Sequence, residues 1–403
     1  MIESIIRHRK ILKRFIPRKM RIWLKTQTGY RKAEKIGKSR KAEKNRCWGV
    51  NLYGELSGAS GLAEASRSTR LGLEKAGIPL CLKDTADGKE EELLSPYAVN
   101  LFHMNPNQLP ELLCRLPEKQ WRASRNIGFW LWEQEKLPLE WSGFFPLFDE
   151  VWTSSEFCAS AIRQSCSCPV TVIPHIVEPV YDASCDRAAF GLPEDMFLFL
   201  SMFDCDSVVD RKNPWGAIQA FLQAFGGRED RAGLVIKARN LDDMTRRKTE
   251  RMLEGYPYVW LLEGDYPREQ VNSLIHMADA CVSLHRAEGF GLVLAEAMYL
   301  GTPVIATNWS ANTEFMNHDV GCLVDAELVS LKKNEPPYRK GSRWAEPDLQ
   351  QAAGYMRRLY EDEKYRTELA ERAKAHIREQ LCVEKAAGLL RARLTEIRKE
   401  LEL

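Results

Sequence analysis

Residues 278–314, ADACVSLHRAEGFGLVLAEAMYLGTPVIATNWSANTE, are the stretch that decides the fold class of this chain. An apolar run at 280–284 predicts a buried strand, and the loop at 285–291 that follows it ends in Gly-Phe-Gly. A helix rich in Ala, Leu and Met is expected from about Leu292, and Gly301 with the Thr-Pro dipeptide after it ends that helix. A further apolar run predicts the next strand. Strand, glycine loop, helix and strand form the unit that binds a phosphate or sugar at a helix N-terminus.

Two carboxylates, Glu288 and Glu296, frame this unit with seven residues between them. Glu288 lies in the loop just before the first helical turn, and Glu296 lies about one turn into the helix. Because helical side chains tilt toward the helix N-terminus, the Glu296 carboxylate is expected to face the same loop. Carboxylates accept hydrogen bonds from the vicinal hydroxyls of a ribose or hexose, and glycines allow a ligand to lie close to the backbone.

This pattern resembles the signature of the retaining glycosyltransferases of family 4, which is Glu-x7-Glu with Glu-Gly-Phe-Gly at its head. The residues that carry the resemblance are Glu288, Gly289, Phe290, Gly291, Leu292 and Glu296, followed by Gly301, Pro303, Val304 and Ile305. The resemblance implies that Glu288 contacts hydroxyls of the donor sugar and that Glu296 binds the ribose of the nucleotide. It also places the glycines, Phe290 and Leu292 at the donor.

The composition is that of a globular protein large enough for two domains. The chain has 403 residues, of which 44% are hydrophobic and 28% charged. Eleven dispersed cysteines without a C-x-x-C pair indicate reduced thiols and a cytosolic protein rather than a disulfide framework or a zinc site. No run of 18 apolar residues predicts a membrane span, and the N-terminus lacks the core of a signal peptide.

The net charge of +2 conceals an asymmetry. Residues 1–46 hold 17 Lys or Arg against three acidic residues, so this N-terminal arm carries +14 and the remaining chain −12. Apolar residues such as Phe15, Ile16, Ile22 and Trp23 are interspersed in it. A basic, intermittently apolar segment suits an anionic membrane surface, and a disordered leader is the alternative. Nucleic-acid binding is not expected, because no RNA- or DNA-binding module accompanies the arm.

Residues 47–176 predict a first Rossmann-like domain. A strand at 47–53 leads into a glycine-rich loop with Gly58 and Gly61, and a helix follows the loop. By itself such a loop is a weak signal, because strand-to-helix turns use glycine for geometry. The family resemblance implies that this loop approaches the donor from the opposite side of the cleft.

The end of a later strand departs from the family pattern. Many family members carry a His-Asp pair there, and the His helps to hold the sugar, whereas this chain has Trp132 and Glu133. Glu133 is therefore interpreted as a carboxylate on the acceptor side or at the sugar. The alternative is an exposed loop charge that pairs with Lys136.

A linker at 177–192 and a second Rossmann-like domain at 193–375 are expected next. Strands and helices alternate in the second domain, which predicts a parallel, doubly wound sheet. Residues 327–348 are interpreted as an inserted surface loop. A C-terminal helix at 376–403 is expected to cross back to the first domain, as is common in this architecture.

The loop after the first strand of the second domain contains Arg211 and Lys212, which match by position the basic pair that neutralises the donor diphosphate in the family. A solvated basic pair at a helix start is the alternative, and Lys237 is a second donor-binding candidate. Asp204 and Asp206 form an Asp-x-Asp pair, but we predict no metal site, because the two-domain pattern differs from the manganese-dependent fold and the basic pair can supply the positive charge.

The loop at 308–314 is a second turn in which the family frequently has adjacent glycines to receive the phosphates. Here Ala311 departs from that pattern, and Ser310, Asn312 and Thr313 are candidate donors instead.

Together these features predict an α/β protein of the GT-B fold, with two Rossmann-like domains facing a cleft. The predicted activity is transfer of a hexose from a nucleotide sugar to an acceptor hydroxyl with retention of configuration, without metal or other cofactor. The expected context is polysaccharide or glycolipid synthesis in the cytoplasm, with a sugar or lipid-linked acceptor and peripheral membrane contact. A sugar-nucleotide epimerase of the same fold and a non-catalytic scaffold that binds membrane or nucleic acid are the alternatives.

Overall fold

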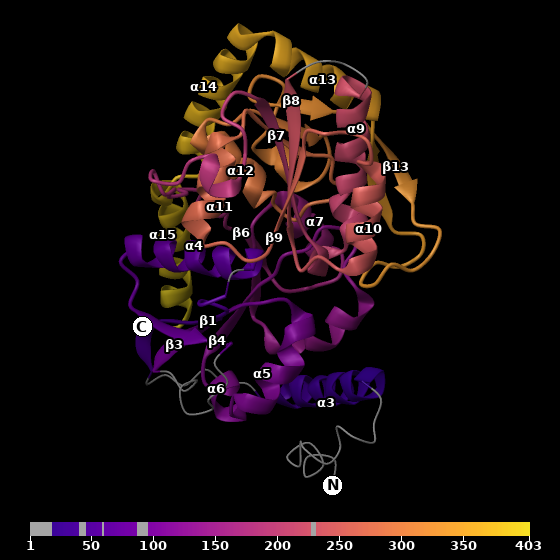
Figure 1. Cartoon of the computed structure of the whole chain (residues 1–403). Coiled ribbons are helices and arrows are strands. Elements are labelled where there is room, and N and C mark those ends of the chain that lie inside the picture. The colour runs from indigo at the N-terminus through magenta and orange to yellow at the C-terminus, as the bar shows by residue number, and fades with distance from the viewer. Residues whose placement is uncertain (1–17, 40–45, 59, 87–95, 227–230) are drawn as a thin grey trace.

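Two six-stranded sheets, each entirely parallel, form the framework of the protein (Figure 1). The computed structural model describes residues 18–39, 46–58, 60–86, 96–226 and 231–403. The predicted α/β class and GT-B arrangement are confirmed, with one sheet in each half of the chain.

The first sheet has the strand order β2-β1-β3-β4-β5-β6. Its strands are β1 (Cys47–Gly54), β2 (Leu80–Asp84), β3 (Tyr97–His103), β4 (Arg125–Phe129), β5 (Glu150–Thr153) and β6 (Val170–Val172). Its helices are α3 (Arg18–Lys38), α4 (Gly61–Lys75), η2 (Pro106–Gln108), α5 (Leu109–Arg115), α6 (Glu118–Arg122), η3 (Leu139–Leu147) and α7 (Glu156–Arg163). Strands β1, β3 and β4 are buried on both faces, as expected for a parallel sheet covered by helices.

The second sheet has the strand order β12-β11-β10-β7-β8-β9. Its strands are β7 (Phe197–Asp204), β8 (Ala232–Arg239), β9 (Val259–Glu263), β10 (Ala280–Ser283), β11 (Val304–Thr307) and β12 (Cys322–Val324). Its helical segments are η4 (Ala188–Phe190), η5 (Cys205–Ser207), α8 (Val209–Lys212), α9 (Pro214–Phe225), α10 (Asp243–Met252), α11 (Arg268–Met277), α12 (Leu292–Leu300), η6 (Ala311–Glu314), α13 (Leu349–Glu361) and α14 (Glu363–Gln380). The strand order reverses between β7 and β10, and ligands of open α/β sheets bind outside the carboxyl ends of strands at such a switch point.

Sequence patterns identified the central strands but missed three peripheral ones. Strand β2 has no fully buried residue, so its pattern lacks the continuous apolar run that marks the central strands. The other two are β13 (Ala326–Ser330) and β14 (Arg343–Pro347), an antiparallel pair within the predicted surface loop.

The described part of the predicted basic arm is a docked helix. Helix α3 packs on η3 and α5 of the first domain, and its residues Ala33 and Ile36 are fully buried. The Tyr30 hydroxyl donates to the Glu140 carbonyl at 2.6 Å. Residues 18–38 are therefore part of the domain rather than an appendage to it, whereas Phe15 and Ile16 lie outside the described residues. In the described part of the chain, no helix combines the length and the apolar character that crossing a bilayer requires.

The last helix, α15 (Val383–Glu400), returns to the first domain and packs along α4 (Figure 1). Its residues Leu390, Leu394 and Ile397 are fully buried in the hydrophobic cluster of the first sheet. The Arg393 guanidinium donates to both carboxylate oxygens of the fully buried Glu150, at 2.8 and 2.6 Å. Burial alone would raise the pKa of Glu150, but these hydrogen bonds with those of its neighbours lower it.

We predict that Arg393→Met destabilises the fold by about 3 kcal/mol, because it leaves the buried Glu150 charge without its bidentate partner. Urea unfolding at pH 7 measures the change. The matched control is Lys399→Met, which removes an exposed charge from the same helix and should change stability by less than about 0.5 kcal/mol. Equal effects of the two substitutions would contradict the prediction.

Candidate active site

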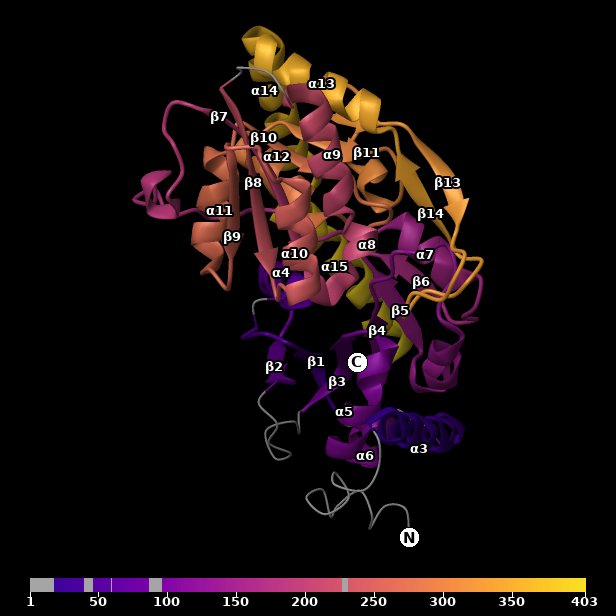
Figure 2. The ribbon, with the colours of Figure 1, turned by 45° about the vertical axis from the view of Figure 1, so that its right-hand side comes forward.

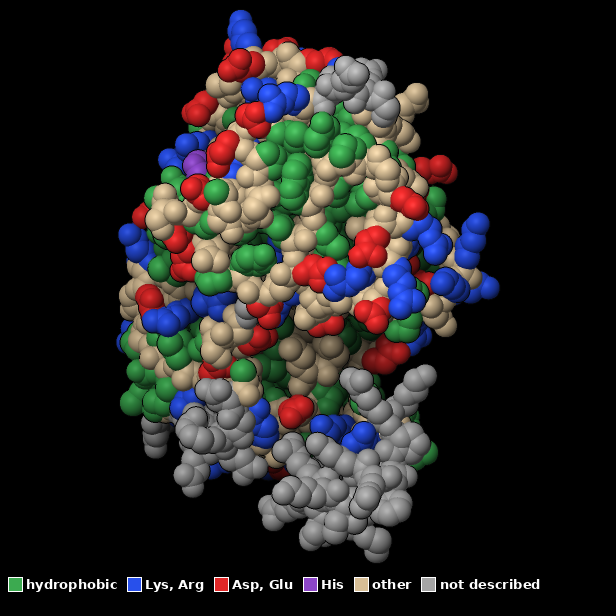
Figure 3. All heavy atoms as spheres, in the orientation of Figure 1, with side chains coloured by type: hydrophobic (Ala, Val, Ile, Leu, Met, Phe, Trp, Pro, Cys, Tyr) green, Lys and Arg blue, Asp and Glu red, His purple; other side chains and the backbone are tan. Residues whose placement is uncertain are grey.

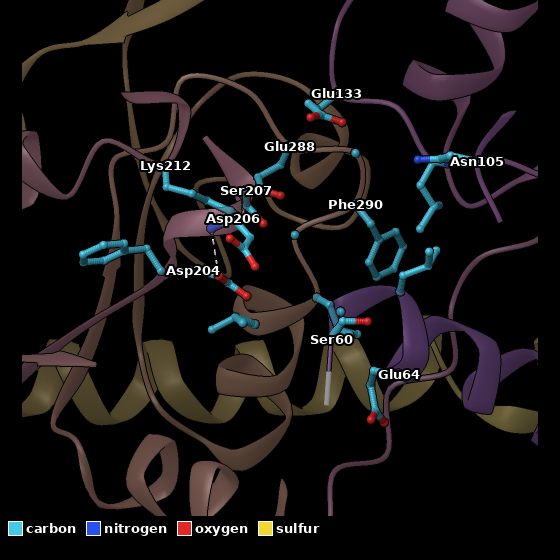
Figure 4. A pocket seen from close by; sticks show the side chains of 18 of the residues that line it. Ser60, Glu64, Asn105, Glu133, Asp204, Asp206, Ser207, Lys212, Glu288 and Phe290 are labelled. Atoms are coloured by element: carbon cyan, nitrogen blue, oxygen red, sulfur yellow. Dashed lines mark hydrogen bonds and ion pairs between the residues drawn. The ribbon is translucent and has the colours of Figure 1, made fainter. Parts of the chain in front are cut away.

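A cavity of about 1700 Å³ lies between the two domains at the carboxyl ends of both sheets. In Figure 3 it is the hollow between the two halves of the molecule, with acidic and basic side chains at its rim. Most of the site residues suggested by the sequence line it: Gly58, Gly61, Glu133, Arg211, Lys212, Lys237, Glu288, Gly289, Phe290, Gly291, Leu292 and Glu296. Figure 4 shows Lys212, Asp204 and Glu288 of the second domain facing Ser60, Glu64 and Asn105 of the first.

The glycine loop opens helix α12 toward the cavity. Gly291 is the N-cap with a φ of +92°, a conformation that favours glycine, and no side chain caps the helix. The amides of Leu294 and Ala295 bond to the Gly291 carbonyl, whereas those of Leu292 and Val293 lie in the first turn at the cavity. An uncapped helix N-terminus presents amide donors and a partial positive charge, which suits a phosphate.

Glu288 is the centre of a charge cluster. Its carboxylate accepts a hydrogen bond from the Lys212 ammonium and lies 3.2 Å from the Arg211 guanidinium. Its backbone N–H donates to the Ser310 hydroxyl at 2.8 Å, which fixes the loop. Burial would raise the pKa of Glu288, but the charges of Lys212 and Arg211 overcome that effect and lower it to about 2.

Arg211 lies almost completely out of water between two carboxylates. Besides Glu288, the carboxylate of Glu133 lies 3.5 Å from its Nε, and its Nη1 donates to the Ala287 carbonyl at 2.7 Å. Burial alone would lower the pKa of Arg211, but the surrounding acidic groups raise it overall. The guanidinium therefore links the second domain to Glu133 of the first domain.

Lys237 lines the cavity without an ion-pair partner among the described residues. Its side chain is buried at the end of β8, and among the described residues it makes no hydrogen bond or ion pair. Its ammonium lies 5.9 Å from the Tyr266 ring centroid. Burial lowers its pKa, as expected for a charge without a close carboxylate partner. The sequence analysis placed Lys237 second to Arg211 and Lys212 as a donor-binding candidate. In the structure, Arg211 and Lys212 both form ion pairs with Glu288.

Glu296 has one free carboxylate oxygen. It is 3% exposed, and its Oε1 accepts from the Arg268 guanidinium. Its Oε2 is buried without a hydrogen-bond partner in the described part of the chain, on a residue that lines the cavity. Sequence reasoning missed Arg268, although its position at the start of α11, after the turn that leaves the carboxyl end of β9, was a usable signal.

The two candidate glycines of the first domain, Gly58 and Gly61, have different surroundings. A Cβ on Gly58 would lie 1.6 Å from Glu55 Oε1, so the flexible Glu55 side chain would have to move aside. A Cβ on Gly61 would meet nothing within 4 Å, so this position, the first of α4, borders open space. Gly61 can therefore leave room for a ligand, as the family resemblance implies.

Two groups from the sequence analysis have other uses in the structure. Ser310 and Thr313 bond to backbone groups and Asn312 bonds to His285 and the Thr307 carbonyl, and none of the three lines the cavity. These three side chains are therefore engaged within the protein, and their proposed contact with phosphates stays a prediction. Asp204 and Asp206 both accept from the Asn240 amide, at 2.9 and 3.0 Å, and the described residues contain no group of three or more His, Cys, Asp or Glu that could hold a metal.

Comparisons with known proteins agree with this geometry. Residues 259–376, which include both glutamates, match the family described as glycosyl transferases group 1. The fold is similar to a crystal structure of Anabaena HepE in complex with UDP and glucose, with 14% identity, a TM-score of 0.60, and coverage of 87% of this chain and 100% of that one. It is also similar to sucrose-phosphate synthase from Thermosynechococcus elongatus, with 17% identity, a TM-score of 0.62, and coverage of 87% and 98%.

A third similar structure is the pneumococcal O-GlcNAc transferase GtfA in complex with UDP and GlcNAc. It is 13% identical, with a TM-score of 0.54 and coverage of 74% of this chain and 56% of that one. At these identities the solved structures establish the GT-B fold alone. The family match carries the assignment of the class.

The protein is a GT-B glycosyltransferase. Its residues 259–376 match the group 1 glycosyl transferases, and the enzyme is a retaining one that uses a nucleotide-sugar donor. The family resemblance inferred from the Glu-x7-Glu pattern is thus confirmed, and the epimerase and non-catalytic scaffold alternatives are set aside.

We predict that Glu288→Gln lowers stability more at neutral pH than in acid. The pKa of Glu288 is about 2 in the folded protein against an ordinary value of 4.5, so the ionised carboxylate stabilises the fold above about pH 5 and loses this effect as the pH falls toward 2. The difference in unfolding free energy from wild type should be about 3 kcal/mol at pH 7 and shrink below pH 4.

Urea unfolding at pH 7, 5 and 3 measures this difference. Glu194→Gln, which neutralises an exposed carboxylate, is the control and should track wild type at each pH. A difference that stays constant down to pH 3 would contradict the ion-pair assignment.

Proposed function

We propose that this glycosyltransferase transfers a hexose from a nucleoside-diphosphate sugar to a hydroxyl of a sugar or lipid-linked acceptor, in the synthesis of a polysaccharide or glycolipid. The observation that carries the proposal is that Glu288 and the unpartnered Oε2 of Glu296 line one cavity at the open N-terminus of α12. Carboxylates at this spacing suit hydroxyls at both ends of a sugar diphosphate nucleotide.

The donor is proposed to lie along α12. Glu296 Oε2 would accept from a ribose hydroxyl, and Glu288 would accept from a hydroxyl of the transferred sugar. The diphosphate between them would face the first-turn amides and the Lys237 ammonium. Lys212, whose side chain is 24% exposed, can be shared between Glu288 and a phosphate, whereas the more buried Arg211 chiefly holds the two carboxylates in place.

The acceptor is proposed to occupy the first-domain end of the cavity. Trp132, Trp141 and Tyr30 line this end together with the charged side chains of Glu140 and Arg339. Aromatic faces bordered by polar groups suit a sugar, whose rings have apolar faces and hydroxyl edges. Glu133 lies at the cavity beside Arg211, so its carboxylate is proposed to face the acceptor.

No metal is proposed to take part in the transfer. Lys237, Lys212 and the α12 N-terminus supply the positive charge that a diphosphate leaving group needs. In a front-face retaining mechanism the leaving phosphate accepts the proton of the acceptor hydroxyl, so no protein nucleophile is required. Turnover should then be unchanged in EDTA, and loss of turnover that Mn²⁺ or Mg²⁺ restores would refute metal independence.

Nucleotide binding tests the donor assignment. Wild-type protein should be stabilised against heat by UDP, GDP or ADP through mass action. Lys237→Met should weaken binding of the preferred diphosphate about tenfold but leave binding of its nucleoside unchanged, because only the phosphates are expected to contact this ammonium. Glu296→Gln should weaken both, and Lys399→Met should change neither.

Turnover tests the transfer itself. Release of nucleoside diphosphate from the preferred nucleotide sugar should fall about a hundredfold in Glu288→Gln, while the affinity for the diphosphate stays within about threefold of wild type. A wild-type protein that binds no nucleotide diphosphate, or a Glu288→Gln variant with wild-type turnover, would refute the proposal.

A second proposal concerns the membrane. Met20, Ile22 and Trp23 on α3 and Leu139 on η3 are each more than half exposed, and Ile22 lines the acceptor end of the cavity. A basic helix with exposed apolar side chains suits an anionic bilayer, which would place the acceptor end toward lipid-linked substrates.

We predict that the full chain sediments with vesicles of phosphatidylcholine and phosphatidylglycerol at low salt, and that high salt or the double substitution Ile22→Ser, Trp23→Ser releases it. Because α3 is packed into the domain, surface substitutions are a cleaner test than deletion of the arm. Met244→Ser, at an apolar residue 78% exposed elsewhere, is the control. Equal sedimentation of all variants would refute membrane contact through this surface.

A further inference from the structure

The segment between β12 and α13 packs against the first domain. It forms the hairpin β13–β14, and Figure 2 shows it running from the second domain along the side of the molecule toward β5, β6 and α7. Three of its side chains, Leu331, Tyr338 and Trp344, are buried in the hydrophobic cluster that contains Trp132 and Trp141 of the first domain. The expectation of a surface loop at 327–348 is therefore wrong, because these apolar residues are buried against the first domain.

Charged contacts fix the hairpin to the first domain. Near the tip, Arg339 donates to the Glu140 carboxylate at 2.5 Å. Along the strand, Arg343 donates to both oxygens of Glu135, at 2.6 and 2.9 Å. Both carboxylates belong to the segment that follows β4, which also carries Glu133.

The same hairpin is fixed to the loop that carries Glu288. The Ala345 N–H donates to the Arg286 carbonyl at 2.9 Å, and the Arg286 guanidinium donates to both oxygens of Glu346, each at 2.8 Å. The Arg286 N–H in turn donates to the Arg211 carbonyl at 2.7 Å. The hairpin tip is thus held at a defined place relative to the catalytic loop and to the first domain.

Tyr338 at this tip contacts the charge cluster directly. It is 2% exposed, its ring centroid lies 5.7 Å from that of Trp132, and its hydroxyl donates to Glu133 Oε1. The same Glu133 oxygen lies 3.5 Å from Arg211 Nε, which makes no hydrogen bond. Glu133 Oε2 has no hydrogen-bond partner within the described residues, and the Glu133 side chain is 20% exposed at the cavity.

We propose that Tyr338 is a positioning residue that holds Glu133 for the acceptor. With the Tyr338 hydroxyl on Oε1, Glu133 is kept from closing fully onto Arg211, and its Oε2 stays free to accept a hydrogen bond from an acceptor hydroxyl. Without that hydroxyl, the attraction between opposite charges 3.5 Å apart draws Glu133 onto Arg211 and removes the acceptor contact. This assignment rests on the proposed function and adds to it the residue that prepares the acceptor side.

A double-mutant cycle tests the proposal. Turnover is measured as nucleoside diphosphate released from the nucleotide sugar that gives the largest thermal shift, with p-nitrophenyl glucoside, galactoside and mannoside as acceptor probes. Water serves as the acceptor if none of these glycosides reacts. Tyr338→Phe keeps the ring on Trp132 and should lower turnover roughly tenfold, as should Glu133→Gln, and the double variant should be no slower than either alone. Where a glycoside reacts, Tyr338→Phe should raise its KM or lower kcat at an unchanged donor KM.

The binding and stability measurements separate positioning from a structural role. Tyr338→Phe should leave the Kd for the nucleoside diphosphate within about twofold of wild type and keep a single cooperative thermal transition. Tyr365→Phe removes a hydroxyl that contacts Cys322, on a residue outside the cavity lining, and should match wild type in turnover.

Additive losses in the cycle, an unchanged rate in Tyr338→Phe, or an equal loss of nucleotide affinity would each overturn the assignment while leaving the proposed function intact. A wild-type protein without any turnover would refute the proposed function, and this assignment with it.

Discussion

The Arg211 guanidinium is almost completely removed from water, and the closed cleft depends on the groups that compensate its charge. Burying such a charge costs several kcal/mol unless carboxylates and carbonyls surround it. Glu288 comes from the loop before α12 in the second domain, and Glu133 comes from the first domain after β4. The charge is fully compensated only when the two domains come together. The same contact that closes the cleft therefore assembles the groups at its centre.

Two other segments hold the domains at this distance. The helix α15 extends the second half of the chain onto the first sheet, where Arg393 compensates the buried Glu150. On the other side, the hairpin β13–β14 inserts Tyr338 beside Trp132. Both segments belong to the C-terminal half of the chain and pack into the N-terminal domain. Besides the linker, the two domains are therefore joined by the packing of these two segments and by the buried ion pairs of Arg211.

In this arrangement the cations Arg211, Lys212 and Lys237 have different partners. Arg211 and Lys212 form ion pairs with Glu288, so this buried carboxylate stays ionised. The ion pairs also fix the orientation of its oxygens. Lys237 has no such partner in the described residues and keeps its charge available at the end of β8. A site built this way offers hydrogen-bond acceptors for sugar hydroxyls and positive charge for a diphosphate without setting one against the other.

The sequence by itself determined the fold class and the resemblance to the glycosyltransferases, and it pointed to residues that line the cavity. Central parallel strands are continuous apolar runs, and the Glu-x7-Glu spacing with its glycines is local, so both are legible along the chain. Only the tertiary structure decided the partners of these residues: Tyr338 on Glu133, Arg268 on Glu296, and α3 packed against η3. These contacts join residues up to 205 positions apart. The periodicity of a segment shows which face is apolar but not which distant surface will cover it.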